Sequence, residues 1–418
     1  MSKEDKKPRI RFEGFTDAWE QRKLGEQMYI KARIGWQALT KSEYLESGDY
    51  YLITGTDIDE SSHTVDLKRC FYVSKERYEM DEKIQVQEGD IIVTKDGTIG
   101  KVAMVTGLDR PATLNSHLFV LRDLSGKVDN YFLLTVLNSH LFDSFVESTK
   151  TGSTLTGMPQ KTFVEFTFLL PNIEEQKRIA SYFRNLDHLI TLHQRKYDKL
   201  QKIKKSMLQK MFPQNGSLFP EIRFEGFTDT WEQRKLSDVA TMHARIGWQN
   251  LRTSEFLDSG DYLLVTGTDF EDGRINYATC HYVERERYEQ DKHIQIENGS
   301  ILITKDGTLG KVAYVQGLSM PATLNAGVFN VVIKDEKVVD EKYLFQYLKA
   351  PFLMDYVDKK ATGGTIKHLN QNILVDFPVV MPCVDEQALI GAYFSNLDHL
   401  ITLHQRKPFY HKMEVIIC

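Results

Sequence analysis

Hydrophobic and polar positions change their period along the chain, and the change separates sheet-forming from helical segments. Between residues 11 and 170, short apolar runs such as DYYLITGTD and HLFVLRDL are separated by glycines and aspartates. Such runs are typical of strands joined by turns. The run DNYFLLTVLNSHLFDSFVES (Asp129–Ser148) has apolar residues at helical spacing and predicts a helix inserted late. This part of the chain is therefore predicted to form a mixed α and β domain.

From Asn172 the pattern becomes that of one long helix. About 40 residues follow without glycine or proline, and at 1.5 Å per residue they span roughly 60 Å. Asn172 is placed to cap the helix, and Glu174 and Glu175 complement the dipole of its first turn. Apolar residues at three-to-four spacing form a packing seam for another helix: Leu186, Ile190, Tyr197, Leu200, Ile203, Met207 and Met211. The helix is expected to stop at Pro213, where PQNGS reads as a linker.

The whole chain is a tandem repeat. RFEGFTDAWEQRKL (Arg11–Leu24) returns as RFEGFTDTWEQRKL, and TKDGTIGKVA returns as TKDGTLGKVA. The helical segment NLDHLITLHQRK occurs twice without change, at Asn185–Lys196 and Asn396–Lys407. The period of about 210 residues is too long for a solenoid, whose repeats run about 20–50 residues. A plain duplication without geometric meaning is the alternative to a functional pair.

Two long helices with matching seams in one chain favour antiparallel pairing about a pseudo-twofold axis. We therefore predict an α+β fold in which two similar mixed α/β domains are joined by two long antiparallel helices. The predicted parts are a first globular domain at 1–171, a long helix at 172–212, a linker at 213–222, a second globular domain at 223–382 and a closing helix at 383–418. Proline cannot continue a helix without loss of a backbone bond, so Pro408 is expected to break the closing helix after Lys407. An altered reading frame would explain the divergent tail.

Composition narrows the class of protein. Of 418 residues 41% are hydrophobic and 27% charged, which is typical of a soluble globular protein. No run of about 18 apolar residues predicts a membrane span, and the N-terminus lacks the apolar core of a secretory signal, so we expect a cytoplasmic protein. The four cysteines never form CxxC, which argues against a disulfide framework or a zinc site. The net charge of −5 excludes a uniformly basic surface but leaves room for a local basic face.

Two similar domains held at a fixed separation suit a target with two similar half-sites, and DNA is the natural candidate. Arginine takes guanine and glutamine takes adenine through paired hydrogen bonds. Tryptophan stacks or wedges, although a role as a core anchor is equally consistent. The residues of these types next to a glycine, where we expect exposure, are Arg33, Trp36 and Gln37 with their repeats Arg245, Trp248 and Gln249.

Three further groups offer contacts to phosphate or bases. Short hydroxyls near glycines are Thr54, Thr56, Thr266 and Thr268. The Lys-Asp-Gly turn offers Lys95, Thr98 and Lys101, repeated as Lys305, Thr308 and Lys311. A small polar loop before a strand offers Thr151, Ser153 and Thr154, aligned with Thr362, Thr365 and Lys367. Each group has a plainer interpretation, since Lys-Asp-Gly is most often a hairpin turn and polar loops are often merely solvated.

Motifs for chemistry are missing from the sequence. GTIGKV and GTLGKV lack the spacing of a phosphate-binding loop, and neither HExxH nor GxSxG occurs. The acidic cluster DEK at Asp81–Lys83 becomes QDK in the second copy, whereas a duplicated catalytic centre should keep its acids. We therefore predict a non-catalytic chain without a metal or cofactor of its own.

The chain resembles the specificity subunit of type I restriction–modification systems, the HsdS family. The resemblance rests on FEGFTDAWEQRKLGE, TGTD, TKDGTIGKVA, the TGS and TGG loops before a strand, and EEQKRIASYFRNLDHLITLHQRK, which together cover nearly the whole chain. It implies that each globular unit is a target-recognition domain reading half of a bipartite site in double-stranded DNA. It also implies that the helices set the spacer and seat two methyltransferase subunits, and that restriction subunits then dock. S-adenosylmethionine, ATP and Mg belong, by this resemblance, to those partners in the bacterial cytoplasm.

Near-identical domains related by a twofold axis should read near-identical half-sites in inverted order, so we expect an interrupted, roughly palindromic target. The copies differ at Ile58–Phe71 against Phe270–His281, and at His117 against Gly327, where the half-sites are expected to diverge. The alternatives are a self-contained DNA methyltransferase or nuclease, a protein-binding scaffold, and a truncated specificity subunit without function. The target bases and the spacer length do not follow from the sequence.

Overall fold

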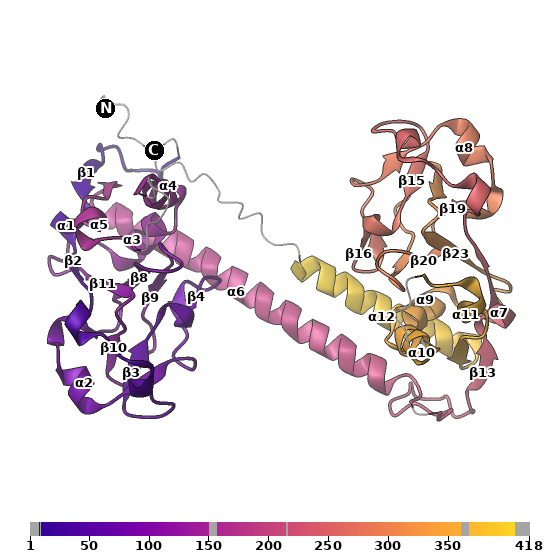
Figure 1. Cartoon of the computed structure of the whole chain (residues 1–418), viewed down its shortest axis with the longest axis horizontal. Coiled ribbons are helices and arrows are strands. Elements are labelled where there is room, and N and C mark those ends of the chain that lie inside the picture. The colour runs from indigo at the N-terminus through magenta and orange to yellow at the C-terminus, as the bar shows by residue number, and fades with distance from the viewer. Residues whose placement is uncertain (1–7, 9, 150–156, 215, 361–367, 406–418) are drawn as a thin grey trace. The chain divides into compact units, whose positions relative to one another are not determined.

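A computed structural model describes residues 8, 10–149, 157–214, 216–360 and 368–405 (Figure 1). These residues form two compact units, which divide inside the long helix between Lys196 and Tyr197. Among the described helices, none combines the length and the apolar character needed to cross a membrane.

The first unit is built mainly of short strands, and its longer helices come late. The expected single helix at Asp129–Ser148 is wrong in one respect, because Asn138 and Ser139 divide it into two helices. Its strands are β1 (Glu20–Lys23), β2 (Tyr29–Lys31), β3 (Tyr50–Ile53), β4 (Ile58–Asp59), β5 (Thr64–Val65), β6 (Phe71–Val73), β7 (Gln85–Val86), β8 (Ile91–Thr94), β9 (Val102–Met104), β10 (Ala112–Leu114), β11 (Leu118–Arg122) and β12 (Thr167–Leu170). Its helices are α1 (Leu24–Gln27), α2 (Lys75–Glu79), α3 (Asn130–Leu137), α4 (His140–Thr149), α5 (Gln160–Phe163) and the start of α6 (Ile173–Lys210).

The second unit repeats this order. Its strands are β13 (Glu232–Lys235), β14 (Ala240–His243), β15 (Leu263–Val265), β16 (Phe270–Glu271), β17 (Arg274–Ile275), β18 (His281–Tyr282), β19 (Gln295–Ile296), β20 (Ile301–Thr304), β21 (Val312–Tyr314), β22 (Ala322–Leu324), β23 (Val328–Ile333) and β24 (Pro378–Met381). Its helices are α7 (Leu236–Val239), α8 (Arg285–Glu289), α9 (Glu341–Lys349), α10 (Phe352–Lys360), α11 (Gln371–Val375) and α12 (Val384–Gln405).

Sheet topology confirms the tandem repeat. A four-stranded sheet has the order β6-β3-β10-β7 in one unit and β18-β15-β22-β19 in the other. Its central pair is parallel in both, with Tyr51 opposite Ala112 and Leu263 opposite Ala322. The first and last strands of each unit, β1 with β12 and β13 with β24, pair antiparallel. Each copy is thus closed on itself as a complete domain.

The long helix begins as predicted. The side chain of Asn172 accepts a hydrogen bond from the Glu175 amide at 2.9 Å, which caps α6. Glu175 does more than complement the helix dipole, because it is fully buried and accepts two hydrogen bonds from Arg11, at 2.6 and 2.7 Å. Arg223 and Glu386 repeat this pair at the start of α12.

Helix α6 contributes to two hydrophobic cores. Ile179 and Ala180 lie in the core of the first unit, whereas Leu200 lies in that of the second, together with Met211 and Phe212, which directly follow the helix. Within the second unit, Lys204 contacts Asp398 and Phe212 stacks on Phe394, so the end of α6 runs antiparallel to α12. The predicted seam residues Leu397 and Ile401 are buried there, at 8% and 5% exposure. The expected break at Pro408 lies outside the described residues.

Candidate nucleic-acid interface

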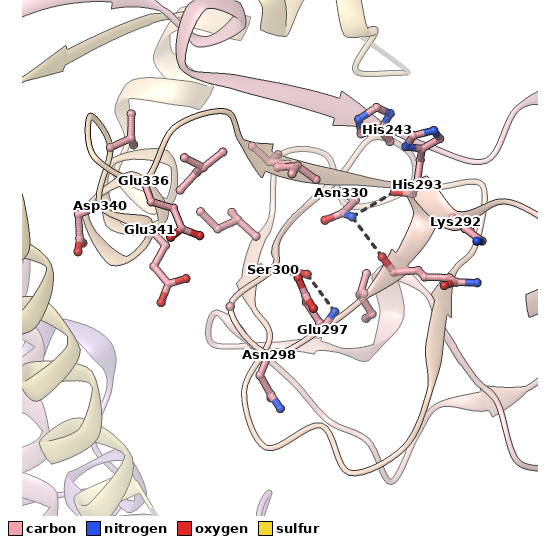
Figure 2. A pocket seen from close by; sticks show the side chains of 18 of the residues that line it. His243, Lys292, His293, Glu297, Asn298, Ser300, Asn330, Glu336, Asp340 and Glu341 are labelled. Atoms are coloured by element: carbon pink, nitrogen blue, oxygen red, sulfur yellow. Dashed lines mark hydrogen bonds between the residues drawn. The ribbon is translucent and has the colours of Figure 1, made fainter.

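A cavity of about 860 Å³ lies in the second unit beside β20 and β23 (Figure 2). His243 and His293 stack at one end of it, with ring centroids 4.8 Å apart. Burial, helped by His293, lowers the pKa of His243 and favours the neutral ring. Glu336 and Glu341 line the other end (Figure 2). Among the described residues, no three histidine, cysteine, aspartate or glutamate side chains gather as a metal ion would require.

In the first unit an ion pair occupies the equivalent place. Arg122 of β11 donates to both oxygens of Asp90, at 2.8 and 2.6 Å. The strand registers place Val332 and Ser300 at these two positions in the second unit, so the pair is lost there. The lining of the cavity at these two positions is therefore not repeated by the duplication.

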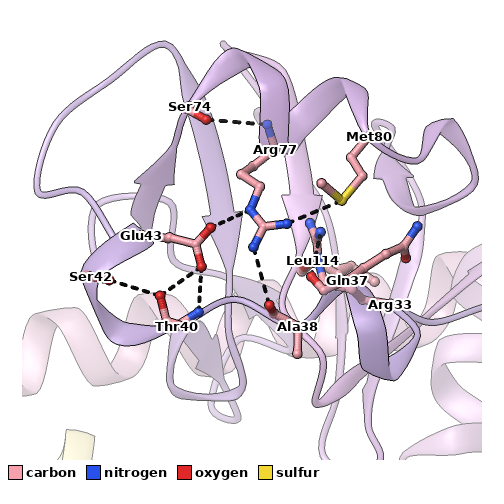
Figure 3. A network of polar contacts seen from close by, with 10 residues as sticks. All are labelled: Arg33, Gln37, Ala38, Thr40, Ser42, Glu43, Ser74, Arg77, Met80 and Leu114. Atoms are coloured by element: carbon pink, nitrogen blue, oxygen red, sulfur yellow. Dashed lines mark hydrogen bonds and ion pairs between the residues drawn. The ribbon is translucent and has the colours of Figure 1, made fainter.

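The expectation that Arg33 and Gln37 are exposed is wrong, since their exposed fractions are 1% and 3%. Arg33 Nε donates to the Leu114 carbonyl at 2.8 Å (Figure 3), and Nη2 donates to Thr113 Oγ1 at 3.1 Å. Burial lowers the pKa of the guanidinium. Arg33 thus holds its turn against β10, and its donors are directed at the protein rather than at a guanine.

The second unit repeats this correction. Arg245 and Gln249 are 1% and 4% exposed, and Arg245 Nε donates to the Leu324 carbonyl at 3.0 Å. The half-exposed side chains of these turns are Ile34 and Ile246. The side chains of Trp36 and Trp248 lie outside what the structure describes.

A network next to Arg33 fixes the loop that follows (Figure 3). Arg77 Nε donates to Glu43 at 2.5 Å, and Glu43 also accepts from the amide and the hydroxyl of Thr40, each at 2.8 Å. The bond from Arg77 and the bonds from Thr40 lower the pKa of Glu43 to about 2. This network belongs to the scaffold and not to a contact surface.

The TGTD segment is a closed turn around a buried aspartate. Thr54 is 6% exposed, and its amide and hydroxyl donate to Asp57 Oδ2 at 2.7 and 2.9 Å, which contradicts its expected role as a surface hydroxyl. Thr266 is half-buried and makes the same bonds to Asp269. Thr56 and Thr268 remain exposed. One hydroxyl per turn is therefore accessible.

The Lys-Asp-Gly turns, Lys95–Thr98 and Lys305–Thr308, directly follow β8 and β20. The ammonium of Lys95 lies over the Phe119 ring at 5.8 Å, and that of Lys305 lies over Phe329 at 5.5 Å. The threonines at the ends of both turns are exposed. Lys101 forms an ion pair with Glu60, whereas Lys311 is exposed. The threonines are thus at the surface, whereas Lys95 and Lys305 are half-buried, and a DNA contact from either turn stays a prediction.

The turn meets the end of the small polar loop. The Met158 amide donates to the Lys95 carbonyl at 2.6 Å, and the Leu369 amide donates to the Lys305 carbonyl at 2.8 Å. The structure thus brings Met158 and Leu369, which directly follow the polar loops, to turns that are far away in the sequence. The loop residues themselves lie outside the described residues: Thr151, Ser153, Thr154, Thr362, Thr365 and Lys367.

Sequence reasoning missed an aspartate–histidine pair at each turn. His117 Nδ1 lies 3.2 Å from Asp96 Oδ2, and His368 Nδ1 lies 2.5 Å from Asp306 Oδ1. All four side chains are substantially exposed. The unmatched His117 was an available signal, and so was His368, which aligns with Gly157 in the polar loop.

Comparison with known proteins identifies the family of this chain. Residues 16–202 and 228–409 match the family described as type I restriction modification DNA specificity domain. The MjaVIII specificity subunit of Methanocaldococcus jannaschii is 24% identical over 336 residues, covering 78% of this chain and 76% of that protein. The MjaIX specificity subunit of the same organism is 22% identical over 364 residues, covering 82% and 78%. The crystal structure of a type I restriction–modification S subunit from M. genitalium has the same fold, with a TM-score of 0.64 and 16% identity over 96% of this chain and 94% of that one. The chain therefore belongs to the family of type I restriction–modification DNA specificity proteins.

Proposed function

We propose that each unit reads one half of a bipartite DNA target, with its Lys-Asp-Gly turn at the centre of the DNA-facing surface. The observation that carries this is the repetition of one turn geometry, with φ of +72° at Gly97 and +73° at Gly307. Both turns present exposed threonines beside a lysine, and such groups position a protein on phosphates. Thr56 and Thr268 add a second surface hydroxyl in each unit.

Because the two units share their sheet order and turn geometry, we expect their half-sites to be nearly the same sequence read on opposite strands. The target is then an interrupted, nearly palindromic sequence. The twelve residues that occur unchanged at 185–196 and 396–407 are consistent with this expectation.

The proposal assigns catalysis to partner subunits. Two methyltransferase subunits dock on the long helices, restriction subunits join them, and S-adenosylmethionine, ATP and Mg act on those partners. The printed names of the relatives, which are specificity subunits of type I restriction enzymes, support this assignment. The absence of nucleotide, hydrolase and metalloprotease motifs from the sequence is consistent with it.

The test is to co-express the chain with its cognate methyltransferase subunit and to map methylated adenines across the host genome by long-read sequencing. An interrupted inverted repeat is the expected result. No new methylation, with both proteins soluble, would contradict the proposal. A variant whose second long helix continues with the sequence of Tyr197–Phe212 would then show whether the divergent tail is the cause.

The competing assignment is a scaffold that binds proteins. Salt separates the two, because DNA affinity falls steeply as counterions are released. Binding of the complex to its mapped duplex at 50 and 200 mM salt should differ by roughly three orders of magnitude or more if six or more phosphates are contacted.

A further inference from the structure

Each unit has one histidine and one glycine next to the aspartate of its Lys-Asp-Gly turn, but the two residues occupy exchanged positions in the two units. In the first unit His117 contacts Asp96, and Gly157 forms an isolated backbone bridge with Asp96. In the second unit His368 contacts Asp306.

Backbone hydrogen bonds establish which positions correspond. The carbonyls of His117 and Gly327 accept from the amides of Lys95 and Lys305, at 2.9 and 2.8 Å. The amide of Met158, which follows Gly157, donates to the Lys95 carbonyl. The amide of Leu369, which follows His368, donates to the Lys305 carbonyl in the same way. His117 therefore corresponds to Gly327, and Gly157 corresponds to His368.

The carboxylate lies between the two segments, with one oxygen toward each. In the first unit Asp96 Oδ2 faces His117, and a Cβ added at Gly157 would lie 1.9 Å from Oδ1. A side chain at position 157 would therefore collide with the Asp96 carboxylate in the orientation that this carboxylate adopts here. In the second unit Oδ1 of Asp306 contacts His368, and a Cβ added at Gly327 would lie 3.8 Å from Oδ2. The imidazole therefore reaches the carboxylate from opposite sides in the two units.

A contribution to folding stability does not explain why both units contain the aspartate–histidine pair. The exposed fractions are 59% for His117 and 31% for Asp96, and 70% for His368 and 41% for Asp306. Ion pairs this exposed contribute little to folding. The pair is nevertheless present in both units, with its histidine drawn from segments that are separate in the sequence, and it lies directly on the turn that carries the proposed interface.

We propose that the aspartate–imidazole pair reads base edges and sets the difference between the two half-sites. The aspartate accepts from the exocyclic amine of cytosine or adenine, so the base pair it reads is the same in both half-sites. The imidazole, held on one side or the other of that carboxylate, contacts the neighbouring base pair, where the half-sites differ. This inference rests on the proposed function.

The test exchanges the histidine within one unit of the full chain. His117→Gly combined with Gly157→His gives the first unit the arrangement of the second. The variant is co-expressed with the methyltransferase subunit and its methylated motif is mapped. The expected motif is more symmetric than that of the parent chain, because the first half-site acquires the base of the second at the position next to the aspartate. Gly327→His with His368→Gly should produce the converse change.

A variant with one substitution tests the inference even if the doubly substituted variants do not fold. His368→Gly removes the imidazole and adds no bulk, and it should relax discrimination at one position of the second half-site by about tenfold. The first half-site should not change and serves as the internal control.

Two outcomes overturn the inference while leaving the proposed function intact. One is a parent motif whose half-sites are identical, and the other is an unchanged motif in the exchanged variants. Absence of any bipartite motif from the parent chain would instead contradict the proposed function itself.

Discussion

Lys204 of α6 and Asp398 of α12 form an ion pair, with 2.5 Å between Nζ and Oδ1 and only 8% and 18% of the two side chains exposed. Asp398 also accepts a hydrogen bond from Gln346 at 2.8 Å. The aspartate repeats in the first unit as Asp187, where the Tyr131 hydroxyl donates to it at 2.6 Å. Two identical helical sequences thus make different contacts, because one of them packs against the end of α6.

We predict that Lys204→Met destabilises the second unit by roughly 3 kcal/mol, because it leaves a largely buried carboxylate without its main partner. Hydrogen exchange followed by mass spectrometry resolves the two units, and the first unit is the internal control. Lys205→Met, at an exposed neighbouring position, should change neither unit. Equal protection in the two variants would show that the pair contributes nothing.

The stability of the second unit should rise between pH 8 and pH 9.5. Burial, reinforced by nearby Lys204, lowers the pKa of Lys349 to about 8, against about 10.5 in an unfolded chain. In this window the unfolded state binds more protons than the folded state, so the free energy of unfolding increases with pH. The measurement is urea unfolding at several pH values, and the rise should be absent in Lys349→Met.

Arg33→Ala should lower the stability of the first unit by roughly 3 kcal/mol, because the buried carbonyl of Leu114 loses a charged donor. It should leave the salt dependence of DNA binding unchanged, since Arg33 does not reach the surface. Arg245→Ala is the matched variant in the second unit. A reduced salt slope in either variant, with unchanged stability, would restore the base-reading role that burial argues against.

In contrast to Arg33→Ala, the variants Lys95→Ala and Lys305→Ala should change the salt dependence of DNA binding. Each removes one cation from the proposed DNA surface, so the slope of log affinity against log salt should fall by about 1. Lys177→Ala, at an exposed site paired with Glu174, is the control. Unchanged slopes for both turn lysines would remove the turn from the interface.

Cysteine labelling should report the opening of each unit separately. Burial raises the pKa of the Cys70 thiol, and it raises the pKa of the Cys280 thiol to about 12, whereas Cys383 is exposed. At pH 8 in a Cys418→Ser background, Cys383 should react within the mixing time. Cys70 and Cys280 should react only as their units open. Rapid labelling of either buried thiol in the native protein would contradict the packing around it.

Local patterns predict part of this fold, because helix caps and apolar spacing are local properties. The Asn172 cap and the burial of Leu200 and Met211 follow from neighbouring residues. Leu186 and Ile190 of the same predicted seam are only half-buried, and the strand order does not follow from the sequence pattern. Arg33 shows where this reasoning fails. A flanking glycine suggested exposure, but the burial of Arg33 is decided by contacts with Thr113 and Leu114, which are distant in the sequence.

The candidate interface shows the same division. The Lys-Asp-Gly turn can be predicted from the sequence, because the residue preferences of turns are local. The contact between Asp306 and His368 spans 62 residues and depends on how the chain returns to the turn. The mismatches of His117 with Gly327 and of Gly157 with His368 are both visible in the sequence, but they do not show there that the two histidines contact the same aspartate position.

The core of the second unit contains residues from the start of this unit, such as Phe212, and from its end, such as Phe394. The core can therefore be completed only after the last helix of the unit has been synthesised. Phe212 leaves the ribosome before any residue of the sheets that will enclose it, whereas Phe394, on which it stacks, is made nearly last. Contacts between chain segments so far apart slow folding, because a large loop must close before they form. Until α12 is released, the apolar end of α6 lacks its partner helix and is a natural substrate for chaperones.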